Sequence, residues 1–517
     1  MNCGVAFYTL DSSNSTTLFG ARLSDLFEPE DTQSDQEPRG SIQQRNAIIG
    51  FLVAIVVVLA IILLVQSCDD GTKSSTSQQT ATAPVEEAPA EEEPVEEAPA
   101  EVEPVEEEPA EIIYDYGVDE DTIRVGAIAD LSGPFAPLVV QIIAAQTAYW
   151  DRVNANGGIA GKQIDFWVED NAYDVPTHLE RYEEMSADDG VVFLSQSTGS
   201  PHTAAIAEAL VEDGLGAIPL SWYSGWPDPE FGENVFESYT NYCYESINAV
   251  DYLANNVVEG DAKLAVLSYP GEYGQDGAAG AKIAAEALGI EVVYDGEAAV
   301  IPGADQTPVI TGLVESGANL VWVTTAPSLL AELMGGAAAT GFEAVWSGNS
   351  PTYNYMLLAT ALAPILDSSF YQSTYNLTWN AGDVPGMADM VATLQEAIPD
   401  DPVSDAYTIG WTEAMAAHQI LEAAAASGDL TRAGVIAAAN ATTVDYMGLA
   451  PNQGYGGEIN DYIVRESYIF DIQADLFDVA ATISGGGSTG SVLMNGGPYV
   501  SDVTAAHVYE GACFVAE

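Results

Sequence analysis

A strand, a helix and a second strand follow one another where regular patterning begins in this chain. A strand-like run over 123–129 is followed by a helical pattern over 139–153 and by a second strand-like run over 163–169, with Gly- and Pro-containing turns between them. Parallel strands need such a crossover connection, so we predict a βαβ unit. Ligands of parallel sheets bind beyond the carboxyl ends of the strands, where the turn 131–137 lies.

The same alternation of strand-like and helical patterns continues almost to the end of the chain. Two successive βα series predict an α/β protein with two doubly wound parallel-sheet lobes, which occupy residues 121–517. The expected strands are 190–195, 216–220, 263–268, 291–294, 319–323 and 344–346. The expected helices are 201–212, 245–255, 277–288, 308–316 and 328–340.

The chain is strongly acidic. It contains 78 Asp and Glu against 12 Lys and Arg, which gives a formal net charge of −66. Nucleic-acid binding needs Lys and Arg at the phosphates, so we expect no nucleic-acid partner. Salt screens the self-repulsion of an acidic surface, and the composition therefore favours a saline habitat. The alternative is that much of the charge is local.

The N-terminal region predicts attachment to a membrane. Residues 1–45 are polar and acidic, and we expect a disordered tail there. Segment 46–67 contains an uninterrupted apolar run over 47–65, which is long enough for a transmembrane or signal helix. Arg39 and Arg45 precede this run. The positive-inside rule therefore puts the N-terminus in the cytoplasm and the remainder outside.

Two forms of anchor stay open. The sequence Val65-Gln66-Ser67-Cys68 resembles a lipobox, which would make Cys68 a lipidation site after cleavage. Gln66 and the long acidic leader fit that pattern poorly, so an uncleaved signal anchor is an equal alternative. Both forms hold the same domain at the cell membrane, on its extracytoplasmic side.

Residues 68–120 form a predicted linker. The unit PVEEAPAE starts at Pro84 and again at Pro94, and PVEEEPAE starts at Pro104. Repulsion between Glu side chains and regularly spaced prolines both favour an extended chain. We therefore expect a disordered acidic stalk between the anchor and the lobes.

The sequence offers no support for catalysis. The four His residues, His178, His202, His418 and His507, are scattered without metal-ligand spacing, and no Cys-x-x-Cys pair occurs. So many carboxylates guarantee chance pairs, and none can be singled out as an acid and base couple. We expect a binding protein rather than an enzyme, with no metal and no cofactor.

Two phrases of the chain resemble a known family. VGAIADLSGPFA (125–136) and AYWDRVNANGGIAGKQIDFWVEDN (148–171) are similar to the opening of type I periplasmic solute-binding proteins, the branched-chain amino acid, amide and urea group of ABC importers. The resemblance implies two lobes joined by a hinge of three crossovers, and an ABC permease as partner. It places 122–242 and about 370–450 in the first lobe and starts the second lobe near Glu245.

A polar loop over 195–201 is the best-supported part of a binding site. It follows a strand and precedes a helix, with Ser200 suited to cap the helix and Pro201 to begin it. Free backbone N–H groups and the helix dipole would converge there on a carboxylate or a carbonyl oxygen. The resemblance implies the same role for Ser197, Thr198 and Ser200. The alternative is that these hydroxyls only cap the helix.

The resemblance also implies ligand contacts after the later strands and in the first turn. Tyr273 matches a tyrosine that closes over the ligand in this family. The remaining implied contacts are Leu138, Ser221, Tyr223, Thr325, Asn349 and Ser350.

One departure from the family concerns the charge of the ligand. Amino-acid binders pair the ligand ammonium with a carboxylate near what aligns with 348–350, and no Asp or Glu stands there. Glu272 or Asp276 could substitute. Because an unpaired buried ammonium is costly, the simpler interpretation is a neutral or amide-like ligand.

Cysteine usage leaves a single candidate disulfide. Cys3 and Cys68 lie outside the predicted lobes, so Cys243 and Cys513 are the only possible internal pair. A bridge is possible if the lobes are extracellular, but sequence alone cannot place the two residues close enough together.

These observations predict an extracytoplasmic solute-binding protein that captures a small polar solute, such as an amino acid, an amide or a urea-like molecule, for an ABC importer. A ligand-sensing receptor ectodomain of the same fold is the alternative. A receptor normally carries a cytoplasmic signalling domain, and residues 1–45 are too few for one.

Overall fold

The computed structural model describes residues 112–516. All of these residues lie in a single compact unit. The predicted tail (1–45), the membrane segment (46–67) with Cys68, and most of the linker lie outside the described residues. Between residues 112 and 516, no helix combines the length and apolar character needed to cross a bilayer.

The first sheet confirms the βαβ unit predicted at the start of the domain. Its four strands are parallel and lie in the order β3-β2-β4-β5. The strands expected at 123–129, 163–169 and 216–220 coincide with β2, β3 and β5 to within one residue, whereas the strand expected at 190–195 lies three residues later, at 193–198. The bounds are β2 (Thr122–Ala129), β3 (Gln163–Asp170), β4 (Phe193–Thr198) and β5 (Gly216–Leu220).

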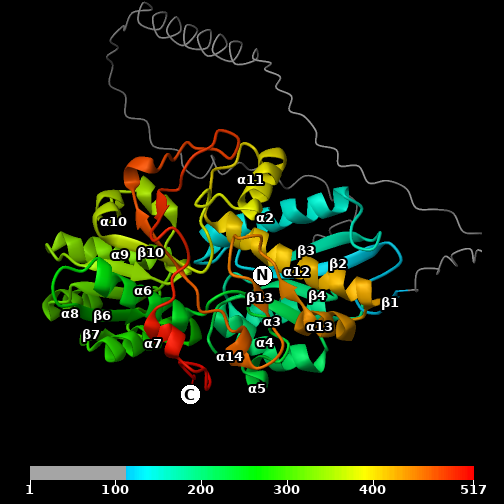
Figure 1. Cartoon of the computed structure of the whole chain (residues 1–517), viewed down its shortest axis with the longest axis horizontal. Helices are drawn as coiled ribbons and strands as arrows, with labels where there is room; N and C mark the ends of the chain where they lie inside the picture. Colours follow the sequence, from blue (N-terminus) through cyan, green and yellow to red (C-terminus); the bar gives the residue numbers. More distant parts are fainter. Residues whose placement is uncertain (1–111, 517) are drawn as a thin grey trace, which may run out of the picture. The chain divides into compact units, whose positions relative to one another are not determined.

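Helices from two distant parts of the chain cover this sheet, as Figure 1 shows with cyan α2 beside yellow-to-orange α12. Ile123 and Val125 of β2 share one buried cluster with Ile142 of α2, whereas Ile128 joins Met185 of α3 in another. Neighbouring strand residues point to opposite faces, so β2 serves both. The helices of this lobe are α2 (Ala136–Ala155), α3 (Val175–Ser186), α4 (Ser200–Glu212), α5 (Pro229–Gly232), α11 (Pro385–Ala397), α12 (Ala406–Ser427) and α13 (Arg432–Ala441).

The second sheet has seven strands in the order β15-β14-β10-β9-β8-β6-β7. Its central strands are parallel, but β14 pairs antiparallel with both β10 and β15. The prediction of an entirely parallel sheet is therefore wrong at this edge of the second lobe. The bounds are β6 (Lys263–Ser268), β7 (Glu291–Gly296), β8 (Leu320–Thr324), β9 (Val345–Gly348), β10 (Phe370–Thr374), β14 (Tyr468–Ile472) and β15 (Ser491–Leu493).

The two faces of the second sheet are also both buried. Leu264 and Val266 pack with α6 and α7, whereas the alternate residue Leu267 packs with α8 and α9. Helix α7 ends at Gly289, which adopts a left-handed conformation (φ 69°) that a residue with a Cβ adopts only under strain. The helices are α6 (Tyr242–Asn256), α7 (Glu272–Leu288), α8 (Thr307–Ser316), α9 (Pro327–Ala339), α10 (Ala363–Ser369) and α15 (Asp502–Ala506).

The chain passes between the two sheets three times. It leaves the first sheet before α6, returns after β10 and leaves again before β14. The return begins after residue 374 rather than near 370 as expected, because β10 belongs to the second sheet. The short connecting elements are β1 (Ile113–Tyr114) paired with β11 (Asp429–Leu430), β12 (Thr443–Val444) paired with β13 (Gln453–Gly454), α14 (Ile459–Tyr462), and 3-10 turns at Ser350–Thr352, Tyr355–Ala359 and Ala474–Leu476.

Candidate ligand-binding site

A pocket lies where the carboxyl ends of strands from both sheets meet. The first lobe contributes the start of α2, the β4–α4 loop and the end of β5, and the second contributes Tyr273 of α7 and the segments after β9 and β10. The empty space amounts to about 780 Å³, including the part that is open to solvent. Parallel sheets bind their ligands at this edge, so topology alone marks this pocket as the candidate site.

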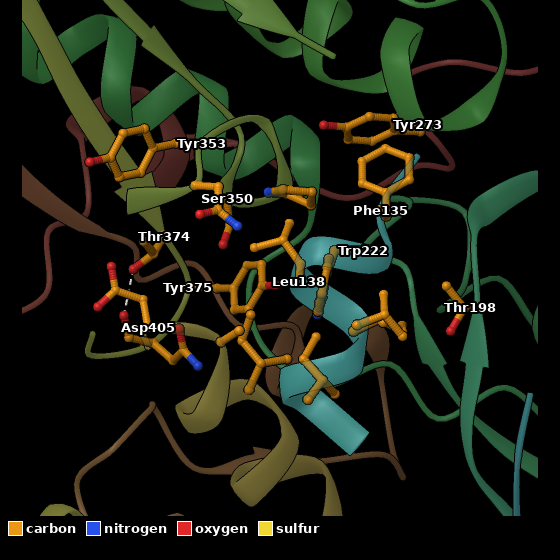
Figure 2. A pocket seen from close by; sticks show the side chains of 18 of the residues that line it. Phe135, Leu138, Thr198, Trp222, Tyr273, Ser350, Tyr353, Thr374, Tyr375 and Asp405 are labelled. Carbon is orange, nitrogen blue, oxygen red and sulfur yellow. Dashed lines mark hydrogen bonds between the residues drawn. The ribbon is translucent and has the colours of Figure 1, made fainter. Parts of the chain in front are cut away.

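Most of the wall is apolar and aromatic. Trp222 packs against Tyr375 with ring centroids 4.0 Å apart, and Phe135 meets the ring of Tyr273 edge-on at 6.0 Å. Leu138 adds an aliphatic surface beside Trp222 (Figure 2). Of the described residues that line the pocket, none is Lys, Arg or His. Such a wall favours a ligand with an apolar body.

The N-terminus of α4 forms one polar part of the pocket. Thr198, Gly199 and Ser200 line it, and no side chain caps this helix. The Ser200 hydroxyl is bonded to that of Ser221 at 2.7 Å, which fixes its orientation. Gly199 has φ 102°, and a Cβ there would overlap the ring of His202. This buried, uncapped helix end supplies backbone N–H groups and a positive dipole end, both of which suit an anion.

A second polar part, which the sequence interpretation missed, surrounds Asp405. This half-buried residue precedes α12 and is the only acidic residue among the described ones that line the pocket. It accepts hydrogen bonds from the Trp379 backbone (3.1 Å), the Thr489 hydroxyl (2.6 Å) and the Ser491 hydroxyl (3.2 Å). Burial raises the pKa of Asp405 to about 6 despite these donors. In the sequence, the only sign that could have pointed to Asp405 is its position immediately before a helix.

Five of the ten residues expected to contact ligand line the pocket. They come from both lobes and from positions more than 200 residues apart in the chain. They are Leu138, Thr198, Ser200, Tyr273 and Ser350.

The other five do not line it, and at least one polar atom of each is hydrogen-bonded within the fold. Ser197 bonds to Thr203 at 2.8 Å, and Ser221 bonds to Ser200 and accepts from the Trp226 indole. Tyr223 donates to the Phe514 carbonyl at 2.6 Å. The Thr325 carbonyl accepts from Tyr273, and Asn349 bonds to Thr324 and Glu245. Four of the five, Ser197, Ser221, Tyr223 and Asn349, stand next to a lining residue in the chain. Their side chains support the pocket wall but do not line it.

The two carboxylates considered as partners for a ligand ammonium also lie elsewhere. Neither Glu272 nor Asp276 lines the pocket. Asp276 accepts from the Ser224 backbone (3.0 Å) and hydroxyl (2.5 Å), and its burial raises its pKa to about 7. Glu245 supports the 349–350 segment from α6, accepting from the Asn349 side chain and the Ser350 backbone. Asp405 is the carboxylate that reaches the pocket.

The buried histidines His178 and His202 support the β4–α4 loop. The His178 ring lies 3.0 Å from the Asn171 amide nitrogen and 3.3 Å from the Ser197 hydroxyl, and burial lowers its pKa to about 3. The ring is therefore neutral near pH 7. Within residues 112–516, no group of His, Cys, Asp and Glu has the arrangement of a metal site.

Cys243 and Cys513 form a disulfide, with Cα atoms 6.3 Å apart. The bond ties the C-terminal segment to the first turn of α6. The same segment contacts the first lobe, where the Cys513 backbone donates to the Ser224 hydroxyl at 2.8 Å.

Comparisons with known proteins agree with this architecture. A family model described as periplasmic binding protein matches residues 122–475. The Leu/Ile/Val-binding protein homolog 3 of Brucella melitensis is 28% identical over 204 residues, which are 39% of this chain and 53% of that protein. The Leu/Ile/Val-binding protein BraC3 of Rhizobium johnstonii is 26% identical over 198 residues, 38% of this chain and 52% of that protein. The chain spans about half the length of the curated relatives it matches.

Two solved structures extend the comparison over most of the chain. A fatty acid ABC transporter substrate-binding protein from Thermomonospora curvata superposes with a TM-score of 0.68 at 25% identity, covering 77% of this chain and 97% of that one. A branched chain amino acid ABC transporter protein from Thermus thermophilus with bound valine gives 0.62 at 19% identity, covering 75% and 98%. The family match, the two lobes and the pocket between them lead to one conclusion: the chain belongs to the type I periplasmic binding protein family.

Proposed function

We propose that this protein is an extracytoplasmic solute-binding protein that captures a small solute for an ABC importer. The observation that carries the proposal is the pocket itself, whose wall is built by both lobes. A ligand between the lobes contacts both, so it stabilises the closed arrangement over any open one. A permease that recognises the closed arrangement would then respond only to loaded protein.

The lining favours a solute that combines an acceptor group with an apolar body. A carboxylate suits the uncapped N-terminus of α4 at Gly199 and Ser200, and an apolar body suits the surface of Trp222 and Leu138. The relatives named for Leu, Ile and Val, and the structural neighbour named for fatty acids, bind molecules that have both features. A urea-like solute would leave most of the aromatic wall without a partner.

A ligand panel tests this proposal. The purified protein is heated with amino acids, amides, urea, and short aliphatic and aromatic acids, each at millimolar concentration. A solute present at 100 times its Kd stabilises the folded state by about 2.7 kcal/mol, which raises the melting temperature measurably. Stabilisation by apolar amino acids, amides or acids is expected. Failure of the whole panel to raise the melting temperature would contradict the proposal.

We also propose that the N-terminal segment tethers this domain outside the cell. The Cys243–Cys513 disulfide supports an oxidising compartment, since such bonds are rare in reducing cytosol. Cys68→Ser separates the two anchors. Loss of lipid labelling and of membrane retention in this variant would establish a lipoprotein, and unchanged retention would establish an uncleaved transmembrane anchor.

Delivery to a permease is tested by transport. Vesicles that contain an ABC permease and ATPase for the bound solute should take it up only when this protein is added. Binding without any stimulation of uptake would contradict the importer role and favour a sensory one.

A further inference from the structure

We propose that the end of the pocket around Asp405 is a second polar subsite, which binds a neutral hydroxyl or carboxamide group of the ligand. This inference rests on the proposed function, because it assumes that the ligand carboxylate or carbonyl lies at the N-terminus of α4. The ligand is then a molecule with an apolar middle and two polar ends, the second of them uncharged.

Unpartnered hydrogen-bond donors mark this subsite. The side chains of Asn354, Asn376 and Thr378 line the pocket and are 5%, 3% and 1% exposed. Among the described residues, no atom accepts a hydrogen bond from the amide nitrogens of Asn354 and Asn376 or pairs with the Thr378 hydroxyl. Buried donors without a partner cost free energy, so these groups favour a ligand atom that accepts.

Asp405, which carries acceptor atoms, lines the same pocket as these donors. The Trp379 backbone and the Thr489 hydroxyl donate to Oδ1, while the Ser491 hydroxyl shares its single proton between Oδ2 at 3.2 Å and the Gln372 amide oxygen at 2.8 Å. A carboxylate has about four acceptor positions, so one on Oδ2 stays free for a ligand donor. Because the pKa of Asp405 is about 6, the group is mostly ionised above pH 7.

The subsite lies away from the α4 end of the pocket. Figure 2 shows Asp405, Thr374 and Tyr375 on one side of Leu138 and Trp222, and Thr198 on the other. The apolar surface therefore separates two polar regions. A ligand that reaches both must carry its polar groups at opposite ends of its apolar body.

The combination of donors and acceptor selects the chemical class. A second carboxylate would meet the ionised Asp405, and an ammonium would pair with Asp405 but leave the Asn354 and Asn376 amides without an acceptor. A hydroxyl or a carboxamide both accepts and donates, so it satisfies the two kinds of group together. No positively charged residue among those described lines the pocket to offset a second negative charge.

Two matched series of acids test the subsite on the purified full-length protein at pH 7.5. The first is hexanoate with 6-hydroxyhexanoate, adipamate, 6-aminohexanoate and adipate. The second is phenylacetate with its 4-hydroxy, 4-carbamoyl, 4-aminomethyl and 4-carboxy derivatives. Each member keeps one carboxylate and one apolar body and changes only the far group. We expect the hydroxyl or carboxamide member to bind about tenfold tighter than the parent acid in at least one series, and the charged members to bind more weakly.

Substitutions then assign the preference to these side chains. Asn376→Leu and Asn354→Leu keep a similar side-chain volume but remove the donors. The Kd of the parent acid divided by the Kd of its hydroxyl or carboxamide derivative should therefore fall towards one. Asn440→Leu, an exposed asparagine on α13, is the control and should keep the ratio. Melting curves confirm that each variant is folded, and either pocket variant suffices if the other does not fold.

The outcomes separate this inference from the function on which it rests. If no acid and no amino acid binds, the proposed function fails. If the parent acids bind and the hydroxyl and carboxamide members show no advantage, or if an ammonium or dicarboxylate member binds tightest, the subsite inference alone is wrong. A preference that persists in both asparagine variants would also overturn it.

Discussion

Glu245 shows how a buried carboxyl group supports the site without entering it. Its Oε1 accepts from the Ser350 backbone at 2.9 Å and its Oε2 from the Asn349 amide at 2.8 Å, which holds the segment after β9 against α6. Burial raises the pKa of Glu245 to about 8, so this side chain is largely protonated in the folded protein near neutral pH.

This pKa predicts a pH-dependent stability. The unfolded chain loses the Glu245 proton near pH 4.3, whereas the folded chain keeps it to about pH 8. The folded state thus binds more protons between these values, and Glu245 lowers the stability progressively from about pH 4.5 to 8. Glu245→Gln removes that proton uptake, so the melting temperature of the variant relative to wild type should rise across this range.

Glu286→Gln, on the exposed face of α7, is the matched control and should follow the wild type at every pH. If the difference in melting temperature between Glu245→Gln and wild type is the same at every pH from 5 to 8, the pKa of Glu245 is the same in the folded and the unfolded chain and the prediction is wrong.

At the residue scale, the sequence identified the right loops but not always the right side chains. Ser197 and Ser200 differ by three positions in one polar loop, yet only Ser200 lines the pocket. Ser197 points to Thr203, a contact that depends on how α4 packs on the sheet. Residue types and spacing carry no information about that packing, so the loop could be predicted and the individual contact could not.

Helices α6 and α7 approach closely because α7 contains Gly280. A Cβ at this position would overlap the Cys243 carbonyl oxygen and the Ser246 hydroxyl. The neighbouring atoms belong to the α6 backbone and to a side chain bonded to it, so neither can move away cheaply.

Gly280→Ala should therefore lower the free energy of unfolding by about 1–3 kcal/mol, despite the higher helix propensity of Ala. Gly335→Ala is the control, because it lies in α9 with no atom nearer to its added Cβ than Leu362 at 4.0 Å. It should stabilise the protein by up to about 1 kcal/mol. Denaturant titrations of both variants check this; equal effects would refute the close-packing argument.

The C-terminal segment is an element that the family resemblance did not predict. The disulfide joins Cys513 to α6 in the second lobe, while the Tyr223 hydroxyl and the Ser224 side chain of the first lobe hold the same segment. The bond closes a loop of 270 residues. Cross-links of long loops restrict the unfolded chain most.

Removal of the bond should therefore destabilise the protein. The double variant Cys243→Ser, Cys513→Ser is expected to lose about 2–5 kcal/mol of unfolding free energy, measured by denaturant titration. Reducing agent should lower the stability of the wild type and leave the variant unchanged. An unchanged midpoint in the double variant would show that the segment is held by its other contacts alone.

Most strands that are joined by crossover helices were predictable, although β10 was not expected, and the strands without such helices were not predictable. The runs at 216–220 and 263–268 coincide with β5 and β6 because each is a short apolar strand between a turn and a helix. Strands β14 and β15 pair antiparallel at the edge of the second sheet. No α-helix lies between β14 and β15, so the alternation on which the prediction relied does not mark them.

The formal charge of −66 acts on the molecule as a whole. Like charges repel in the compact state, and this repulsion weakens as the Debye length falls from roughly 10 Å in 0.1 M salt to 3 Å in 1 M salt. The melting temperature should therefore rise over this range of NaCl concentration at pH 7.5. The rise should shrink near pH 4, where many carboxylates are protonated. A melting temperature that is independent of salt at pH 7.5 would contradict this expectation.

The pocket is a property of the whole molecule. Phe135, Trp222 and Asp405 meet in it although they lie far apart in the chain. The resemblance predicted which strand ends converge, since these follow from the topology. Asn354 comes from the loop between β9 and β10, Asn376 from the return to the first lobe after β10, and Asp405 from the loop before α12. The alternating pattern does not describe the paths of these loops.

Calorimetric titration with the tightest solute from the ligand panel tests most directly whether binding occurs between the lobes. Leu138→Trp places a large side chain in the pocket from α2, while Val140→Trp places the same side chain two positions away on the exposed face of that helix, where Val140 is 41% exposed. We expect at least a tenfold loss of affinity in Leu138→Trp and wild-type affinity in Val140→Trp. Wild-type affinity in Leu138→Trp would contradict binding between the lobes.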